Sequence, residues 1–163
     1  MNARSAGVVL AVVQLMLVSG VGLKYAADRA RLPSGWARTV PFDPSLPLRG
    51  RYVRLRLEVP LSAAAPAAGV LSRVRLVVEG GRVHAVTDTI AGLEAMIDTA
   101  GGSPVARLSD PMAFFIPEHV PDPSLRSQGE ELWAQVTLPT AGPPRPTRLG
   151  VRRGGELQPL DLR

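Results

Sequence analysis

Two acidic residues and a histidine lie close together in one proline-rich stretch, and these side chains are the best suited in the sequence to metal or acid–base chemistry. Glu118, His119 and Asp122 fall within five positions, with Asp110 shortly before them. Carboxylate and imidazole ligands suit a divalent metal ion. One hypothesis is therefore an envelope hydrolase or metalloenzyme that uses Glu118, His119 and Asp122. The alternative is a solvated polar loop, since no His-Glu-x-x-His pattern occurs.

Residues that other catalytic chemistries need are missing from the sequence. The 163 residues include no cysteine, which excludes disulfides, thiolate metal sites and a cysteine nucleophile. Lys24, the single lysine, directly follows a long apolar run and is a poor partner for a catalytic serine. The glycine pairs lack the context of nucleotide-binding loops. The sequence therefore predicts no cofactor and favours a non-enzymatic protein.

Basic side chains lie along one face of each of two predicted strands. Arg54 and Arg56 share a face of one strand, and Arg73 and Arg75 share a face of another. If these strands pair, the four arginines form a ladder that could contact anionic lipid head groups. A solvated face is the alternative. Aromatic residues make up only 4% of the chain, too few to favour stacking on bases, and we expect no nucleic acid partner.

The N-terminal part of the chain carries a long uncharged run, Ala6 to Leu23. Eighteen such residues are just enough for a helix to cross the bilayer core. A cleavable signal peptide is the alternative, but its apolar stretch is usually shorter, and Lys24-Tyr25 before Ala26-Ala27 makes a poor cleavage site. We predict an uncleaved signal anchor over residues 1–31 and a soluble domain over 32–163.

The soluble domain has the pattern of a mainly β protein. From Tyr52 to Val59 apolar and polar residues alternate, as in a strand with one buried face. Glycine pairs at 80–81 and 154–155 predict tight hairpins. Similar strand–proline–glycine layouts over 49–90 and 128–163 suggest an internal duplication, with chance similarity as the alternative. We expect a β-sandwich or small barrel with one short helix at 90–100 and an internal strand at 112–116.

A short motif links the chain to a known family. The matching residues are Pro41, Asp43, Pro44, Leu48, Arg49, Gly50, Tyr52 and Leu55, followed later by Glu118 in FFIPEHV. In these residues the chain resembles the GDYXXLXY family of bacterial membrane-anchored proteins. It departs from the family signature at Arg51, where the family has aspartate, and at Leu57, where it has tyrosine. The resemblance implies an N-terminal anchor, a β-rich domain outside the cytoplasm and often a polytopic membrane protein encoded nearby, which is a candidate partner. It implies no biochemical activity.

Charge counting and the resemblance disagree on topology. Arg4 precedes the apolar run, whereas Lys24, Arg29 and Arg31 follow it, and the positive-inside rule then favours a cytoplasmic domain weakly. The resemblance implies the opposite orientation. Because the charge difference is small, we predict a single-pass cell-membrane protein with its soluble domain on the extracytoplasmic side.

Overall fold

The computed structural model describes residues 3–42, 52–62, 67–100 and 102–162. The chain divides into two compact units, Met1–Leu32 and Pro33–Arg163. This division lies one residue from the predicted boundary between anchor and soluble domain.

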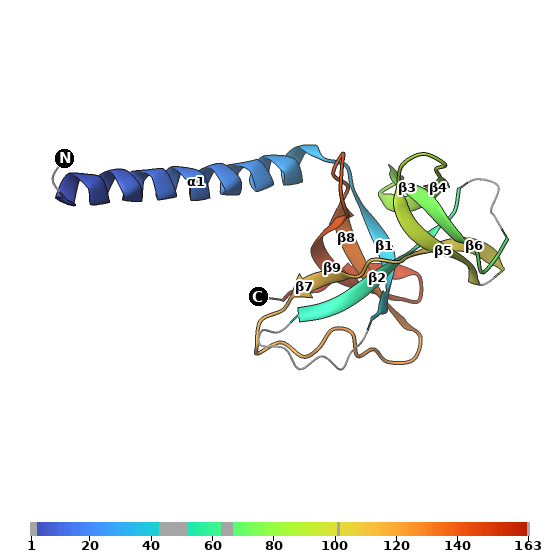
Figure 1. Cartoon of the computed structure of the whole chain (residues 1–163). Helices are drawn as coiled ribbons and strands as arrows, with labels where there is room; N and C mark the ends of the chain where they lie inside the picture. Colours follow the sequence, from blue (N-terminus) through green and yellow to red (C-terminus); the bar gives the residue numbers. More distant parts are fainter. Residues whose placement is uncertain (1–2, 43–51, 63–66, 101, 163) are drawn as a thin grey trace. The chain divides into compact units, whose positions relative to one another are not determined.

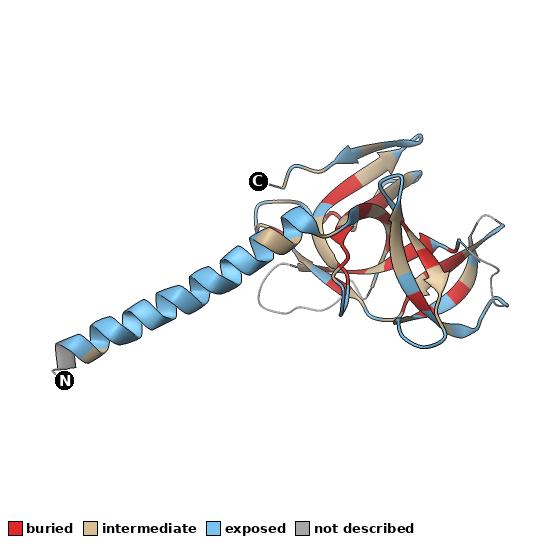
Figure 2. Cartoon of the chain, turned by 90° about the horizontal axis from the view of Figure 1, so that it is seen from above, coloured by how far each residue is buried: buried red, intermediate tan, exposed pale blue. Residues whose placement is uncertain are grey.

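The first unit is one long helix, α1 (Ala3–Arg31). The segment Ser5–Arg31 has a mean hydropathy of 2.2 and is long and apolar enough to cross a membrane, a property it shares with signal sequences. Its apolar side chains are exposed along the helix, which is pale blue over nearly its whole length in Figure 2. Exposed valine and leucine on every side of a helix fit a lipid environment, because a helix packed in a soluble core would bury one face.

The second unit contains a closed six-stranded barrel. Its strands are β1 (Ser34–Pro41), β2 (Tyr52–Pro60), β3 (Leu71–Glu79), β4 (Arg82–Thr87), β5 (Leu93–Ala100) and β6 (Ser103–Leu108). They follow the order β1-β4-β3-β5-β6-β2, and β1 closes the ring by pairing with β2. The prediction of a mainly β protein with a small barrel is confirmed.

Four further strands extend this sheet. They are β7 (Met112–Phe115), β8 (Glu130–Thr137), β9 (Arg145–Arg153) and β10 (Glu156–Pro159). β8 pairs with β1, β9 with β8 and β10 with β9, while β7 pairs with the start of β2. Figure 1 shows β3 to β6 at one end of the domain and β7, β8 and β9 at the other, with β1 and β2 running between them. β1 and β2 therefore belong to both halves.

The core follows from the alternation in β2. Leu55, Leu57 and Val59 have no exposed surface and lie in one cluster with Ile97 of β5 and Leu149 of β9. Because alternate residues of a strand point to opposite faces, this pattern directs one face inward. The sequence prediction of which face is buried is confirmed for β2.

Both predicted glycine hairpins are present, but the strands before them pair differently. Gly80 and Gly81 connect β3 to β4, and Gly154 and Gly155 connect β9 to β10, all four with positive φ. β8 pairs directly with β9. β2, its proposed counterpart, pairs with β1, β6 and β7, whereas β3 pairs with β4 and β5. The duplication therefore gains no support from the strand order and stays a prediction.

Two expectations about individual elements are wrong. Residues 90–100 were expected to form a short helix, but Leu93–Ala100 is strand β5, paired with β3 and β6. Ile90, the first residue of that expected helix, is 86% exposed. The strand at 112–116 is not internal, since β7 ends the sheet and Phe115 is 76% exposed. In both segments strand pairing decided the structure, which apolar spacing alone does not reveal.

Candidate functional site

The family-like motif is only partly within the described residues. Pro41 ends β1 and pairs with Leu55, whose side chain is buried in the barrel core. Tyr52 begins β2, pairs with Phe115 of β7 and packs against its ring at 6.0 Å between centroids. These three positions have structural roles. Asp43, Pro44, Leu48, Arg49, Gly50 and Arg51 lie outside the described residues.

The arginines expected to form one ladder lie on strands that do not pair with each other. Arg54 and Arg56 are on β2, and both guanidinium groups lie over the ring of Phe42, at 5.5 and 3.9 Å from its centroid. β2 and β3 are not neighbours in the sheet, so the condition for a four-arginine ladder is not met. Sequence reasoning also missed Phe42, which lies within the motif but was not assigned a partner.

Arg73 and Arg75 form a separate basic site on β3, and both are exposed. Arg75 Nε lies 3.7 Å from Asp88 Oδ2. The pKa of Asp88 is lowered, chiefly because its carboxylate accepts hydrogen bonds from the backbone N–H groups of Ile90 and Ala91, with Arg75 adding a smaller effect. Asp88 neutralises part of this site, so Arg73 is the more available cation for an anionic surface.

A row of alternating charges crosses five neighbouring strands on the outer face of the sheet. Glu58 of β2, which is only 5% exposed, lies 3.8 Å from Arg38 of β1 and 3.7 Å from Arg107 of β6. Arg107 continues to Asp98 of β5 at 3.3 Å, and Arg38 continues to Glu131 of β8 at 3.3 Å. The alternation from Tyr52 to Val59 puts Glu58 on the polar face of its strand, and nothing local indicates that its carboxylate lies buried between arginines of the two neighbouring strands.

At the Glu131 end of this row lies Trp133, whose ring has two arginine side chains close to it. Trp133 of β8 is 8% exposed, and its indole N–H donates a hydrogen bond to Glu131. The guanidinium carbons of Arg82 and Arg152 lie 5.7 and 5.4 Å from its ring centroid. Such contacts stabilise a buried aromatic ring next to a charged surface. Sequence reasoning missed this cluster, whose members come from β4, β8 and β9.

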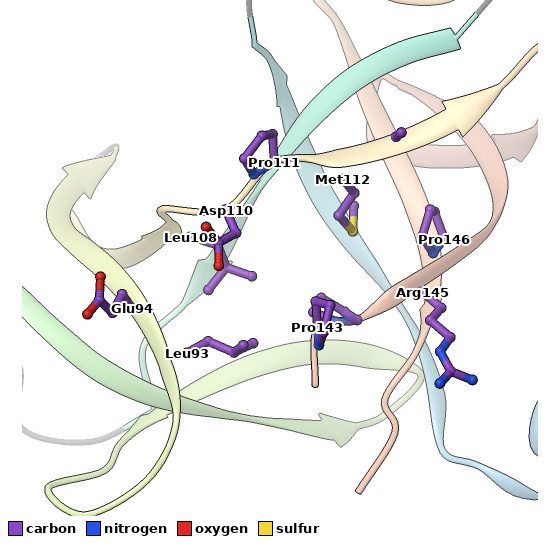
Figure 3. A pocket seen from close by; sticks show the side chains of 11 residues that line it. Leu93, Glu94, Leu108, Asp110, Pro111, Met112, Pro143, Arg145 and Pro146 are labelled. Atoms are coloured by element: carbon purple, nitrogen blue, oxygen red, sulfur yellow. The ribbon is translucent and has the colours of Figure 1, made fainter. Parts of the chain in front are cut away.

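An apolar cavity of about 230 Å³ opens between β5, β7 and the start of β9. Leu93, Leu108 and Met112 line it opposite Pro143 (Figure 3). The arginine at its edge, Arg145, extends its guanidinium away from the proline rings (Figure 3). A second cavity of about 450 Å³ shares Leu93 and Pro144 with the first. Apolar linings with few polar groups suit the contact of an apolar side chain better than acid–base chemistry.

The residues proposed for metal chemistry do not come together. Among the described residues, no group of three histidine or acidic side chains has the geometry to hold a metal ion. Glu118 and His119 are exposed in the turn after β7, and the Asp122 carboxylate accepts a hydrogen bond from the backbone of Ser124. The arrangement of Glu118, His119 and Asp122 in the described residues therefore gives the metal-site hypothesis no support, and the alternative of an envelope hydrolase or metalloenzyme stays a prediction.

The chain matches no protein-family model, no curated protein and no solved structure.

Proposed function

We propose that this protein is a single-pass membrane-anchored envelope protein without enzymatic activity, which acts as an accessory subunit or interaction module for a polytopic membrane partner. The observation that carries the proposal is the helix Ser5–Arg31, long and apolar enough to span a bilayer and joined to a separate β unit. The motif around Tyr52 and Leu55, through its resemblance to the GDYXXLXY family, supports the polytopic partner and the extracytoplasmic placement of the domain.

Features of the β unit support a role in interaction. Phe115 on the terminal strand β7 and Leu125 in the following loop are 76% and 74% exposed. Exposed aromatic and aliphatic side chains are typical of surfaces that contact other proteins. β7 contains no charge or proline within Met112–Phe115, whereas the opposite end of the sheet, β10, carries Glu156 and Pro159. Charges and prolines are what usually protect a sheet edge from pairing with another chain.

The partner is tested by purification from native membranes. A tagged full-length chain, expressed at its native level and extracted in mild detergent, should bring one polytopic protein with it in fixed ratio. Phe115→Ser should lower that ratio, and Ile90→Ser, at an exposed apolar position outside both cavities, should leave it unchanged. Recovery of the wild-type chain alone, after gentle extraction in several detergents, would contradict the proposal.

Topology and anchoring are tested separately from the partner. Alkaline phosphatase fused after Arg163 should be active, and the intact N-terminal mass of the membrane-bound protein should show that the helix is retained. Activity of a cytoplasmic reporter instead, at the same fusion site, would reverse the orientation. A mass that corresponds to a chain starting after Leu23 would mean that the segment is a cleaved signal peptide.

Contact with anionic lipid head groups remains part of the proposal for Arg54, Arg56, Arg73 and Arg75. Arg54 and Arg56 are engaged with Phe42, so the exposed pair on β3 should dominate. The chain is reconstituted into nanodiscs that lack anionic lipid, and their binding to vesicles with and without phosphatidylglycerol is compared. Arg73→Gln with Arg75→Gln should weaken binding to the anionic vesicles by roughly thirty-fold, at about 1 kcal/mol for each of the two arginines near the surface. Equal binding of the wild-type chain to both kinds of vesicle would exclude the contact.

A further inference from the structure

Gln14 is an isolated hydrogen-bonding side chain in the apolar helix α1. It lies eight residues after Ala6 and nine before Leu23, at the centre of the uncharged run. At 1.5 Å per residue it would lie about 12 Å from either end, close to the middle of a bilayer. The side chain is exposed on the helix surface.

A carboxamide at that depth needs a partner. It carries two N–H donors and an acceptor oxygen, and burying such a group in hydrocarbon without hydrogen bonds costs a few kcal/mol. Water and lipid tails cannot supply these bonds at the middle of the membrane, but a neighbouring helix can.

The face around Gln14 is shaped for close approach of another helix. Successive residues are rotated by 100°, so Gly7, Ala11, Gln14, Val18 and Gly22 fall within an arc of about 80°. Gly7, Ala11 and Gly22 bring little side-chain volume to this face. Small residues on the face that carries a polar side chain allow two backbones to approach and the hydrogen bond to form.

We propose that α1 pairs with α1 of a second copy of this chain, with the two Gln14 side chains hydrogen-bonded to each other across the interface. The second copy is the occupant because every copy crosses the membrane in the same direction. Parallel helices therefore place both Gln14 residues at the same depth. A carboxamide is also complementary to itself, since it donates and accepts at once. This inference rests on the proposed membrane anchoring.

The chain contains no cysteine, so single cysteines can report which face of α1 meets its partner. Ala11→Cys lies on the Gln14 face, and Val9→Cys lies on the opposite side, about 160° away. Each full-length variant is oxidised in native membranes and examined without reductant. We expect a cross-linked dimer of the chain with Ala11→Cys and little with Val9→Cys.

The role of Gln14 is tested in the Ala11→Cys background. Gln14→Leu should weaken dimerisation by about five- to thirty-fold, the equivalent of one interhelical hydrogen bond of 1–2 kcal/mol. Gln14→Asn should retain most of it. Equal cross-linking from both faces, no effect of Gln14→Leu, or cross-links only to a different protein would overturn the proposal.

A separate extraction experiment shows whether the proposed membrane anchoring is wrong, independently of the helix pairing. Alkaline carbonate should leave all these variants in the membrane. If it extracts the wild-type chain, the proposed anchoring fails together with the pairing. If the chain resists extraction but does not cross-link, only the pairing is overturned.

Discussion

At the scale of single residues, the buried charge of Glu58 depends on the two arginines beside it for compensation. Its carboxylate is nearly inaccessible and lies between Arg38 and Arg107, each at less than 4 Å. Removing one member of a buried ion pair leaves the remaining charges poorly compensated, which costs more than the pair contributes. Both arginines are partly exposed, so water offsets some of this loss.

We therefore expect Glu58→Ala to lower the free energy of unfolding by about 2–3 kcal/mol. The measurement is chemical denaturation of the full chain in detergent micelles, followed by tryptophan fluorescence. Glu94→Ala, at an exposed position on β5, should change stability by less than about 0.5 kcal/mol. Equal effects of the two substitutions would show that the charge row contributes little.

The pH dependence of stability should follow two carboxylates with lowered pKa values. Backbone N–H groups of Ile90 and Ala91 lower the pKa of Asp88 below 3.8, and the hydrogen bond from Arg153 lowers the pKa of Glu130 below 4.5. A carboxylate with a lowered pKa in the folded state stabilises the fold above its unfolded pKa and loses this effect as pH falls through the folded value. The full stabilisation should be present above about pH 5.

The melting temperature should therefore decline as the pH falls below about 5 and through the folded-state pKa values of the two carboxylates. Removal of the hydrogen bond to Glu130 in Arg153→Gln should make this decline shallower while lowering the melting temperature at pH 7. A variant that keeps the wild-type pH profile would show that the Glu130–Arg153 pair makes no contribution.

At the scale of elements, the segment 90–100 was compatible with a helix from its sequence but forms strand β5 over Leu93–Ala100. As a helix, residues 90–100 would bury Ile90, Leu93 and Ile97 together. As a strand, Ile97 is 1% exposed in the barrel core and Ile90 lies in solvent before the strand begins. The effects of substituting Ile90 and Ile97 on stability therefore distinguish the strand from the helix.

We expect Ile97→Ala to lower stability by about 2–5 kcal/mol because it leaves a cavity. Ile90→Ala should have an effect within about 0.5 kcal/mol. Thermal unfolding of the full chain followed by circular dichroism measures both. Comparable losses for the two variants would favour the helix instead.

At the scale of the whole molecule, β1 links the barrel to its extension. One edge of β1 pairs with β8, while β2 and β4 also pair with β1. Leu57 in the barrel and Leu149 in the extension have no exposed surface and belong to the same core cluster. The β unit should therefore unfold in one cooperative step.

Leu57→Ala and Leu149→Ala should each shift that single transition to lower temperature, with a loss of about 2–5 kcal/mol. Circular dichroism and tryptophan fluorescence should report coincident curves for both variants. Two separate transitions in either variant would mean that the barrel and its extension unfold independently.

The sequence by itself determined the features that depend on local pattern. The apolar run of α1 and the buried face of β2 follow from the order of residues, and the glycine pairs at 80–81 and 154–155 from the backbone conformation that tight turns require. Only the tertiary structure decided which strands are neighbours. Strand order separated Arg54 from Arg73 and turned 93–100 into β5. It also buried Glu58 between Arg38 and Arg107. The physical reason is that strand pairing joins residues far apart in the chain, so the environment of a side chain depends on neighbours that no local pattern specifies.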